Sequence, residues 1–159
     1  MPLADDGPGV TIRHAGVGDA AEVAQMLGEL GYPDEVEAVA ARLRQFATSD
    51  RDAVLVAEGD GRLVGIVALS LTPLLAGGGW WSRITALAVD PRIRRRGVAA
   101  ALVAEAERMA TDGGSRLMQL NCGRRPERVA AHEFYPAVGY RDQYDHHVLY
   151  EKRLDGPAG

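Results

Sequence analysis

The stretch that decides the fold is ITALAVDPRIRRRGVAAALVAEAERMA, residues 84–110. It opens with an apolar strand pattern over residues 84–89, which stops at the following Asp-Pro because proline has no N–H for a strand ladder. A basic turn with one glycine covers residues 92–97, and an alanine-rich helix is predicted over residues 98–110. The sequence therefore predicts a strand, a positively charged turn and a helix in immediate succession.

The turn is a predicted socket for a pyrophosphate. The first backbone N–H groups of a helix have no partners within it, and the helix dipole adds partial positive charge at the same end. Gly97 lets a ligand approach the backbone closely, and three consecutive arginines add full charges. We expect backbone N–H donation to matter more than side-chain pairing here, and we expect Arg92 to be a solvated surface residue. The predicted cofactor contacts in this unit are Arg94, Arg95, Arg96, Gly97, Val98, Ala99 and Ala100.

Two motifs carry a resemblance to a known family. RRRGVA, residues 94–99, fits Q/R-x-x-G-x-G/A and resembles the acetyl-CoA signature of the GCN5-related N-acetyltransferases, the GNAT superfamily. AHEFYPAVGY, residues 131–140, is similar to that family's A-x-x-F-Y-x-x-x-G-F/Y. The resemblance implies a mixed α/β sheet whose two parallel central strands splay apart, with the pantetheine arm of the coenzyme in the gap.

The pattern along the chain predicts one α/β domain over residues 10–154, between loose tails at residues 1–9 and 155–159. About seven strands are expected, at residues 10–14, 53–58, 63–72, 80–89, 117–121, 140–144 and 147–154. About four helices are expected, at residues 19–30, 34–47, 98–110 and 127–138. Because a helix joins the strands at 80–89 and 117–121, these two strands should run parallel.

Composition narrows the class of protein. The 159 residues are 47% hydrophobic and 25% charged, as in an ordinary soluble globular protein, and the net charge of −4 argues against general nucleic-acid binding. No apolar run approaches membrane-spanning length, no secretory signal pattern appears, and the lone Cys122 excludes an internal disulfide. We therefore expect a cytoplasmic protein with no membrane or nucleic-acid partner. No residue spacing resembles a zinc site, so no metal is expected.

The strand before the turn is the expected partner of the pantetheine arm. An edge opened by splaying exposes backbone N–H and C=O groups, with which the arm pairs like an added strand. The predicted contacts are the backbones of Leu87, Ala88 and Val89, and one N–H, such as that of Val89, is placed to hold the thioester oxygen as it becomes an oxyanion. The alternative is a fully paired core strand.

Tyr135 is the predicted catalytic residue. The family resemblance gives the tyrosine at this position the role of protonating the leaving thiolate. A phenol with a reference pKa near 10 still carries its proton at pH 7, whereas a thiol with a reference pKa near 8.5 gives the better leaving group. The alternative is a core tyrosine whose hydroxyl satisfies a backbone group.

Two positions depart from the family pattern. Many members carry a strand glutamate as general base where this chain has Thr85, which is no base at neutral pH. Many members also have an asparagine where this chain has Arg128, and Asn121 is a partial substitute for that coenzyme contact. Cys122 is expected to be a small buried hydrophobe rather than an acyl carrier. The general base stays open among His132, Glu133, His146, His147, Asp145, Glu29 and bulk water.

The predicted function is transfer of an acetyl group from acetyl-CoA to a primary amine by direct attack in a ternary complex. The amine is expected to belong to a small molecule. Three alternatives remain at this point. One is a non-catalytic sensor that binds CoA or an acyl-CoA, and another is an acetyltransferase acting on protein N-termini or lysines. The third, an RNA-binding protein using the arginine cluster, is disfavoured by the acidic net charge. A homodimer is what the family resemblance suggests.

Overall fold

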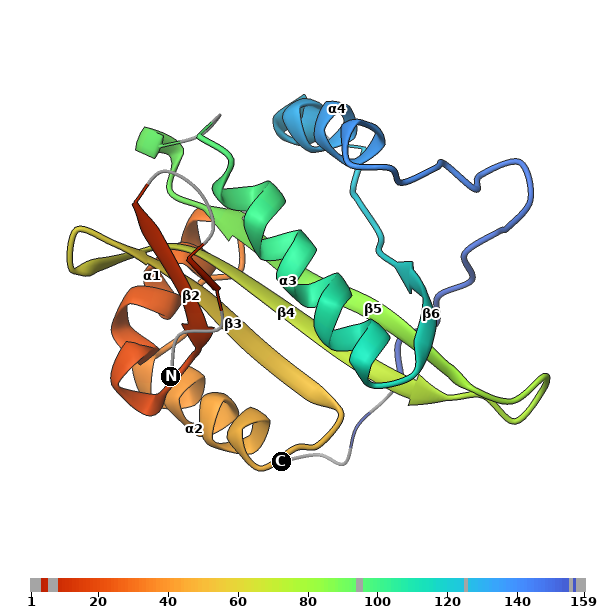
Figure 1. The fold of residues 1–159 in the computed structure, drawn as a ribbon, viewed down its shortest axis with the longest axis horizontal. Helices are drawn as coiled ribbons and strands as arrows, with labels where there is room; N and C mark the ends of the chain where they lie inside the picture. Colours follow the sequence, from red (N-terminus) through yellow and green to blue (C-terminus); the bar gives the residue numbers. More distant parts are fainter. Residues whose placement is uncertain (1–3, 6–8, 94–95, 125, 155, 157–159) are drawn as a thin grey trace. The chain divides into compact units, whose positions relative to one another are not determined.

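The structure is a computed structural model that describes residues 4–5, 9–93, 96–124, 126–154 and 156. It has two units, the N-terminal unit (Met1–Asn121) and the C-terminal unit (Cys122–Gly159), each described here by itself (Figure 1). The strands of the N-terminal unit are β1 (Ala4–Asp5), β2 (Val10–His14), β3 (Asp52–Gly59), β4 (Arg62–Pro73), β5 (Trp80–Val89) and β6 (Ser115–Gln119). Its helices are α1 (Ala20–Glu29), α2 (Val36–Ala47) and α3 (Val98–Asp112), with short 3₁₀ turns η1 (Val17–Asp19) and η2 (Pro91–Ile93).

The strands of the N-terminal unit form one sheet in the order β1-β2-β3-β4-β5-β6. Every neighbouring pair is antiparallel except β5 and β6, which run parallel and are joined by α3. This confirms the parallel pair expected from the sequence, because a helical crossover returns the chain in the same direction. The Asp-Gly turn between β3 and β4 has Asp60 at φ 52° and Gly61 at φ 73°, the left-handed conformation that a tight hairpin turn requires.

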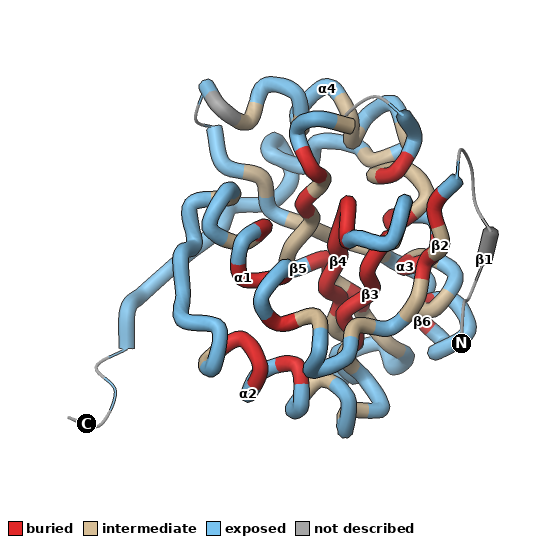
Figure 2. The backbone as a smooth tube through the Cα atoms, turned by 90° about the vertical axis from the view of Figure 1, so that its left-hand side faces the viewer, coloured by how far each residue is buried: buried red, intermediate tan, exposed pale blue. Residues whose placement is uncertain are grey.

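Helices cover both faces of the sheet. Val54 of β3 and Ala68 of β4 lie in one buried cluster with Val23 of α1 and Leu43 of α2. The opposite face packs against α3, since a Cβ added to Gly65 would lie 2.8 Å from Leu102 Cδ1 and 3.1 Å from Val98 Cγ1. Figure 2 shows the buried backbone concentrated in β3 and β4, which are sandwiched between the two helical layers. Strands buried on both faces read as continuous apolar runs, as β3 and β4 do.

The expected seven strands are wrong. The sheet holds five strands of five or more residues, β2 to β6, and the two-residue β1, which lies inside the segment expected to be a loose tail. Residues 140–144 and 147–154 form no strand; they are all described and are irregular apart from a turn. Their alternating apolar residues have strand propensity, but propensity does not supply a neighbouring strand, and Val148 and Tyr150 are 71% and 89% exposed.

The C-terminal unit consists of η3 (Pro126–Arg128), α4 (Val129–Ala137) and an irregular segment after them. Helix α4 ends at Ala137, and Gly139, two residues later, has a φ of 97°, which suits the left-handed position after a helix. The Tyr140 N–H donates to the Tyr135 carbonyl at 3.0 Å. The rings of Phe134, Tyr135 and Tyr140 meet edge to face, with centroid distances of 5.2 and 5.8 Å.

Candidate functional site

The parallel pair β5 and β6 separates halfway along β5. The paired residues are Trp80 with Ser115, Ser82 with Met118 and Arg83 with Gln119, and within the described chain no strand pairing between β5 and β6 continues beyond them. On its other side β5 stays paired with β4 as far as Val89. The edge of Leu87, Ala88 and Val89 that faces away from β4 is therefore free of strand pairing within the part of the chain that the structure describes. The fully paired core strand considered above does not describe this segment.

Buried serines hold the closed end of the parallel pair together. Ser82 and Ser115 are 0% and 4% exposed, and the Ser115 hydroxyl lies 3.0 Å from that of Ser82. The Ser82 hydroxyl donates to the Leu117 carbonyl at 2.7 Å. A buried hydroxyl is costly without a hydrogen-bond partner, so this network holds β5 and β6 together at one end. The two strands separate at the other end.

A β-bulge marks the point of separation. Ala86 pairs with Ala68 and Ile84 pairs with Leu69, so Thr85 is the extra residue of β5 and has no partner in β4. A bulge bends its strand and changes the direction of the following side chains. Thr85 is exposed, and its hydroxyl makes a long bond of 3.4 Å to the Ala68 carbonyl. A threonine hydroxyl does not ionise near neutral pH, so the bulge offers no base.

The start of α3 presents unpaired backbone donors. Gly97 is its N-cap at φ 82° and ψ 1°, and no side chain caps the helix. The Ala101 N–H donates to the Gly97 carbonyl at 2.9 Å, which leaves the N–H groups of Gly97, Val98, Ala99 and Ala100 without intrahelical acceptors. The first turn contains no acidic residue to offset the dipole. Arg96 is exposed, whereas Arg94 and Arg95 lie outside the described residues.

An ion-pair cluster that was not predicted from the sequence holds the chain directly after β5. The Asp90 carboxylate, 7% exposed, accepts from the Arg92 backbone N–H at 2.9 Å and from its guanidinium at 2.8 and 3.0 Å. Arg62 lies 3.8 Å from the same carboxylate, and the Asp90 N–H donates to the Val64 carbonyl at 2.8 Å. Hydrogen bonds from Arg92 lower the pKa of Asp90 to about 2. Arg92 is thus bound rather than merely solvated, and an Asp-Pro-Arg directly after a strand was the available signal.

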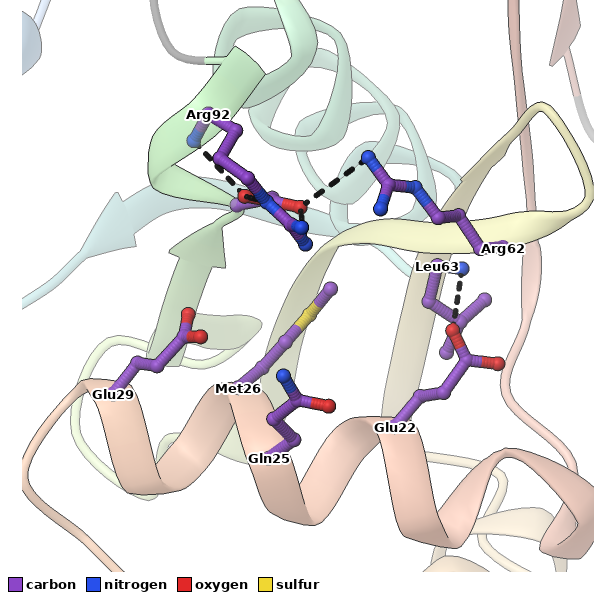
Figure 3. A pocket seen from close by; sticks show the side chains of 8 residues that line it. Glu22, Gln25, Met26, Glu29, Arg62, Leu63 and Arg92 are labelled. Atoms are coloured by element: carbon purple, nitrogen blue, oxygen red, sulfur yellow. Dashed lines mark hydrogen bonds and ion pairs between the residues drawn. The ribbon is translucent and has the colours of Figure 1, made fainter.

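A small cavity of about 120 Å³ lies beside this cluster, on the face of the sheet that α1 covers (Figure 3). Glu29 and Gln25 point from α1 toward Arg92, and Met26 lies between them and the sheet. The Glu22 carboxylate of α1 accepts a hydrogen bond from the Leu63 N–H at 2.8 Å. The cavity mixes carboxylates with arginines, so it has no strong preference for ligands of one charge.

Tyr135 lies in the C-terminal unit, on α4. Its pKa is raised to about 12, chiefly because the phenol is buried, and Cys122 adds to the rise while Arg128 opposes it. The phenol therefore stays protonated throughout the neutral range. In the described chain its hydroxyl has no hydrogen-bond partner, so the alternative role, satisfying a backbone group, is not seen. Arg128 is half-buried at the start of α4, Asn121 is exposed and Cys122 is half-buried.

The candidate bases are scattered over both units. His132 Nε2 lies 2.8 Å from the Gly123 carbonyl, Glu133 is exposed on α4, and Glu29 lines the cavity on α1. Asp145, His146 and His147 are exposed in and after the turn that follows α4. Among the described residues no group of three or more His, Cys, Asp and Glu side chains is arranged to hold a metal ion. No helix in the described ranges is both long and apolar enough to cross a membrane.

The fold has many solved counterparts. A transcriptional regulator from Bacillus halodurans superposes with a TM-score of 0.78 at 23% identity, covering 91% of this chain and 99% of that one. A glucosamine-6-phosphate N-acetyltransferase from Arabidopsis thaliana gives a TM-score of 0.76 at 18% identity, covering 93% of this chain and 100% of that one. An aminoglycoside N-acetyltransferase solved in complex with CoA gives 0.74 at 22% identity, covering 96% and 100%.

Comparison of the sequence itself gives the family. A search of curated proteins found no match. The chain does match the Acetyltransferase (GNAT) family over residues 21–140, a range that includes both motifs, the bulged strand β5 and the uncapped start of α3. The chain therefore belongs to the GNAT family of acetyltransferases.

Proposed function

We propose that the protein transfers the acetyl group of acetyl-CoA to the primary amine of a small molecule. The observation that carries this proposal is the pair of open backbone surfaces in the N-terminal unit. One is the uncapped start of α3, Gly97 to Ala100, and the other is the unpaired edge of Leu87 to Val89. Both supply the backbone donors that a diphosphate and an amide-containing pantetheine arm require.

In this account the coenzyme binds along one continuous piece of chain. The diphosphate accepts hydrogen bonds from the N–H groups of Gly97, Val98, Ala99 and Ala100, and Arg94, Arg95 and Arg96 add charge. The pantetheine arm pairs with the backbone of Leu87, Ala88 and Val89. The Asp90–Arg92 pair holds the first residues after the pantetheine surface. By family resemblance, Asn121 and Arg128 are further contacts.

The reaction is a direct acyl transfer. The neutral amine attacks the thioester carbon, a C–N bond forms and the C–S bond breaks. The amine proton passes to water or to a base that is still unassigned, and the departing sulfur receives a proton from Tyr135. A strand N–H, such as that of Val89, stabilises the oxyanion of the tetrahedral intermediate. The protein supplies proximity, an oxyanion donor and a protonated phenol, and no metal enters the scheme.

Thr85 in place of a strand glutamate favours one other function, a sensor that binds CoA or an acyl-CoA without turnover. A time course of free-thiol release from acetyl-CoA separates the two functions. The proposed enzyme releases thiol faster when a panel of primary amines is added, in proportion to enzyme concentration. Tight binding of acetyl-CoA with no amine-dependent release would instead favour the sensor.

We further propose a cytoplasmic location, because a lone cysteine suits a reducing compartment. A homodimer follows only from the resemblance, and light scattering of the purified chain tests it. Small amines rank above protein substrates because several structurally similar proteins, including aminoglycoside N-acetyltransferases, act on small molecules. One similar protein is a ribosomal-protein-alanine N-acetyltransferase, so an alanyl peptide belongs in the amine panel.

A further inference from the structure

One face of β5 carries an arginine with no partner in the described part of the chain. The direction of its side chain follows from strand register. Ser82 pairs with Leu71, and Leu71 faces α3, since a Cβ added to Gly113 at the end of α3 would lie 2.5 Å from Leu71 Cδ2. Successive residues of a strand point to opposite faces, so Arg83 points to the face that α1 and α2 cover elsewhere.

The neighbours of Arg83 on that face offer it no counter-ion. Arg83 pairs with Ser70 of β4, and the next pair on the same face is Trp81 with Thr72. Directly opposed residues of an antiparallel pair share a face, so the four side chains form one strip of two hydroxyls, an indole and a guanidinium. The buried indole N–H of Trp81 also lacks an acceptor among the described residues. The strip therefore holds unpaired donors and no carboxylate. Asp52 of β3, which pairs with Ser70 from its other side, shares this face, but its carboxylate accepts from the Ser49 hydroxyl at 2.7 Å and makes no ion pair with Arg83.

The state of Arg83 is unusual within this chain. The half-buried Arg13 binds Asp19 and Glu58, and even the largely exposed Arg92 binds Asp90. Arg83 is half-buried, yet its side chain makes no hydrogen bond, ion pair or ring contact with any described residue. Partial burial of a cation without an anion is unfavourable, and a guanidinium binds carboxylate or phosphate oxygens with two parallel hydrogen bonds. The missing partner is an anion.

The position of Arg83 relates the missing anion to the reaction. Its pairing with Gln119 is the last between β5 and β6, and the bulge at Thr85 follows two residues later. At about 3.3 Å per residue, Arg83 lies roughly 13 Å along the strand from Leu87, where the pantetheine surface begins. An extended arginine side chain shortens that span. An acceptor that is bound by Arg83 and attacks a thioester near Leu87 has to span the part of this distance that the arginine side chain does not cover.

We propose that the amine acceptor carries an anionic group, a carboxylate or a phosphate, and that Arg83 binds this group and so determines acceptor specificity. The inference rests on the proposed acetyl transfer and names its substrate class. It sets this chain apart from an enzyme for polyamines, whose additional positive charges Arg83 would repel.

The test compares matched amines with the purified protein and acetyl-CoA. The pairs are glycine with glycinamide, 2-aminoethyl phosphate with ethanolamine, and glucosamine 6-phosphate with glucosamine. The native protein is expected to show a kcat/KM at least about tenfold higher for the anionic member of a pair, since one charge-assisted contact contributes roughly 1.4 kcal/mol or more. The carboxylate and phosphate pairs show which anion is the natural one.

The variant Arg83→Gln removes the charge and keeps a polar, though shorter, side chain. It is expected to raise KM for the anionic amine about tenfold, with little change in kcat, in KM for the neutral partner or in KM for acetyl-CoA. Arg83→Lys restores the charge but not the planar fork, so part of the preference should return. Arg116→Gln, which alters an exposed arginine of β6, is the matched control and should change none of these values.

Equal kcat/KM values within every pair would overturn the inference, as would an equal loss for both members in Arg83→Gln. Turnover of neither member of any pair would also count against it. The proposed function is judged separately by acetyl-CoA binding and by thiol release with the wider amine panel. Failure of the specificity claim is therefore distinguishable from failure of the acetyltransferase claim.

Discussion

At the scale of single residues, the structure separates the groups that shape the site from those that act in it. Asp90 shapes it, because its buried carboxylate is bonded to Arg92 and holds the turn directly after β5. Tyr135 is the group proposed to act, and burial keeps its phenol protonated. A sequence motif points to Tyr135, whereas no local motif points to Asp90, because the partners of a carboxylate depend on how neighbouring strands end.

Tyr135→Phe is expected to lower kcat about 100-fold while leaving KM for acetyl-CoA unchanged. The factor is at the low end for general acids, because a phenol whose pKa is raised to about 12 is a weak proton donor. The reactive form is the protonated one, which is lost only as pH rises through about 12. Steady-state rates should therefore show no fall caused by Tyr135 below about pH 11. An unchanged kcat at saturating substrates would remove the residue from the mechanism.

Asp90→Asn is expected to lower the free energy of unfolding by about 1–3 kcal/mol at pH 7, since it leaves the Arg92 guanidinium without its carboxylate. The pKa of Asp90 is depressed to about 2, so the native ion pair contributes above the unfolded-state pKa near 4 and is lost as pH falls toward 2. Urea unfolding at several pH values should show the two proteins converging over that window.

The control for that experiment is Asp112→Asn, which alters an exposed carboxylate paired with Arg108 on α3. Exposed pairs contribute little, so its effect should stay within about 0.5 kcal/mol. If Asp90→Asn behaved like this control, the ion pair would not stabilise the turn directly after β5.

At the scale of elements, the site arises where regular structure is interrupted. A bulge at Thr85, the separation of β5 from β6 and an uncapped helix start at Gly97 each leave backbone groups unpaired. The sequence predicted the helix start well, since Pro, Gly and an alanine run mark it locally. The bulge left no local signal, because it depends on the register between β4 and β5, which only the paired strands define.

Gly97→Ala tests the helix start. No atom lies within 4 Å of the added Cβ, so the cost is backbone strain at φ 82°, about 1 kcal/mol. Relief of that strain reorients the first N–H groups, and calorimetry should find acetyl-CoA bound about tenfold more weakly. Gly61→Ala is the matched control, at φ 73° and equally open space in the β3–β4 turn. Gly61→Ala should lose about as much stability as Gly97→Ala but keep the native affinity for acetyl-CoA. Equal affinities of the two variants for acetyl-CoA would contradict the role of Gly97.

At the scale of the whole molecule, the first 121 residues followed the sequence closely, whereas in the last 38 the predicted helix is present as α4 and the two predicted strands are not. In the N-terminal unit, apolar alternation, turn residues and helix boundaries all favour one arrangement. In residues 140–154 the apolar pattern is similar, but strand formation depends on an available edge and not on the pattern itself. Family membership, shown over residues 21–140, agrees with the motifs read from the sequence.

The most direct test of the central claim is titration calorimetry with CoA, dephospho-CoA and pantetheine. Because the α3 amides are proposed to bind the diphosphate, CoA and dephospho-CoA, which both contain it, should bind with similar affinity. Pantetheine, which lacks it, should bind about 100-fold more weakly, a difference of roughly 2.7 kcal/mol. Equal affinity for all three ligands, or no measurable binding of CoA, would contradict the account.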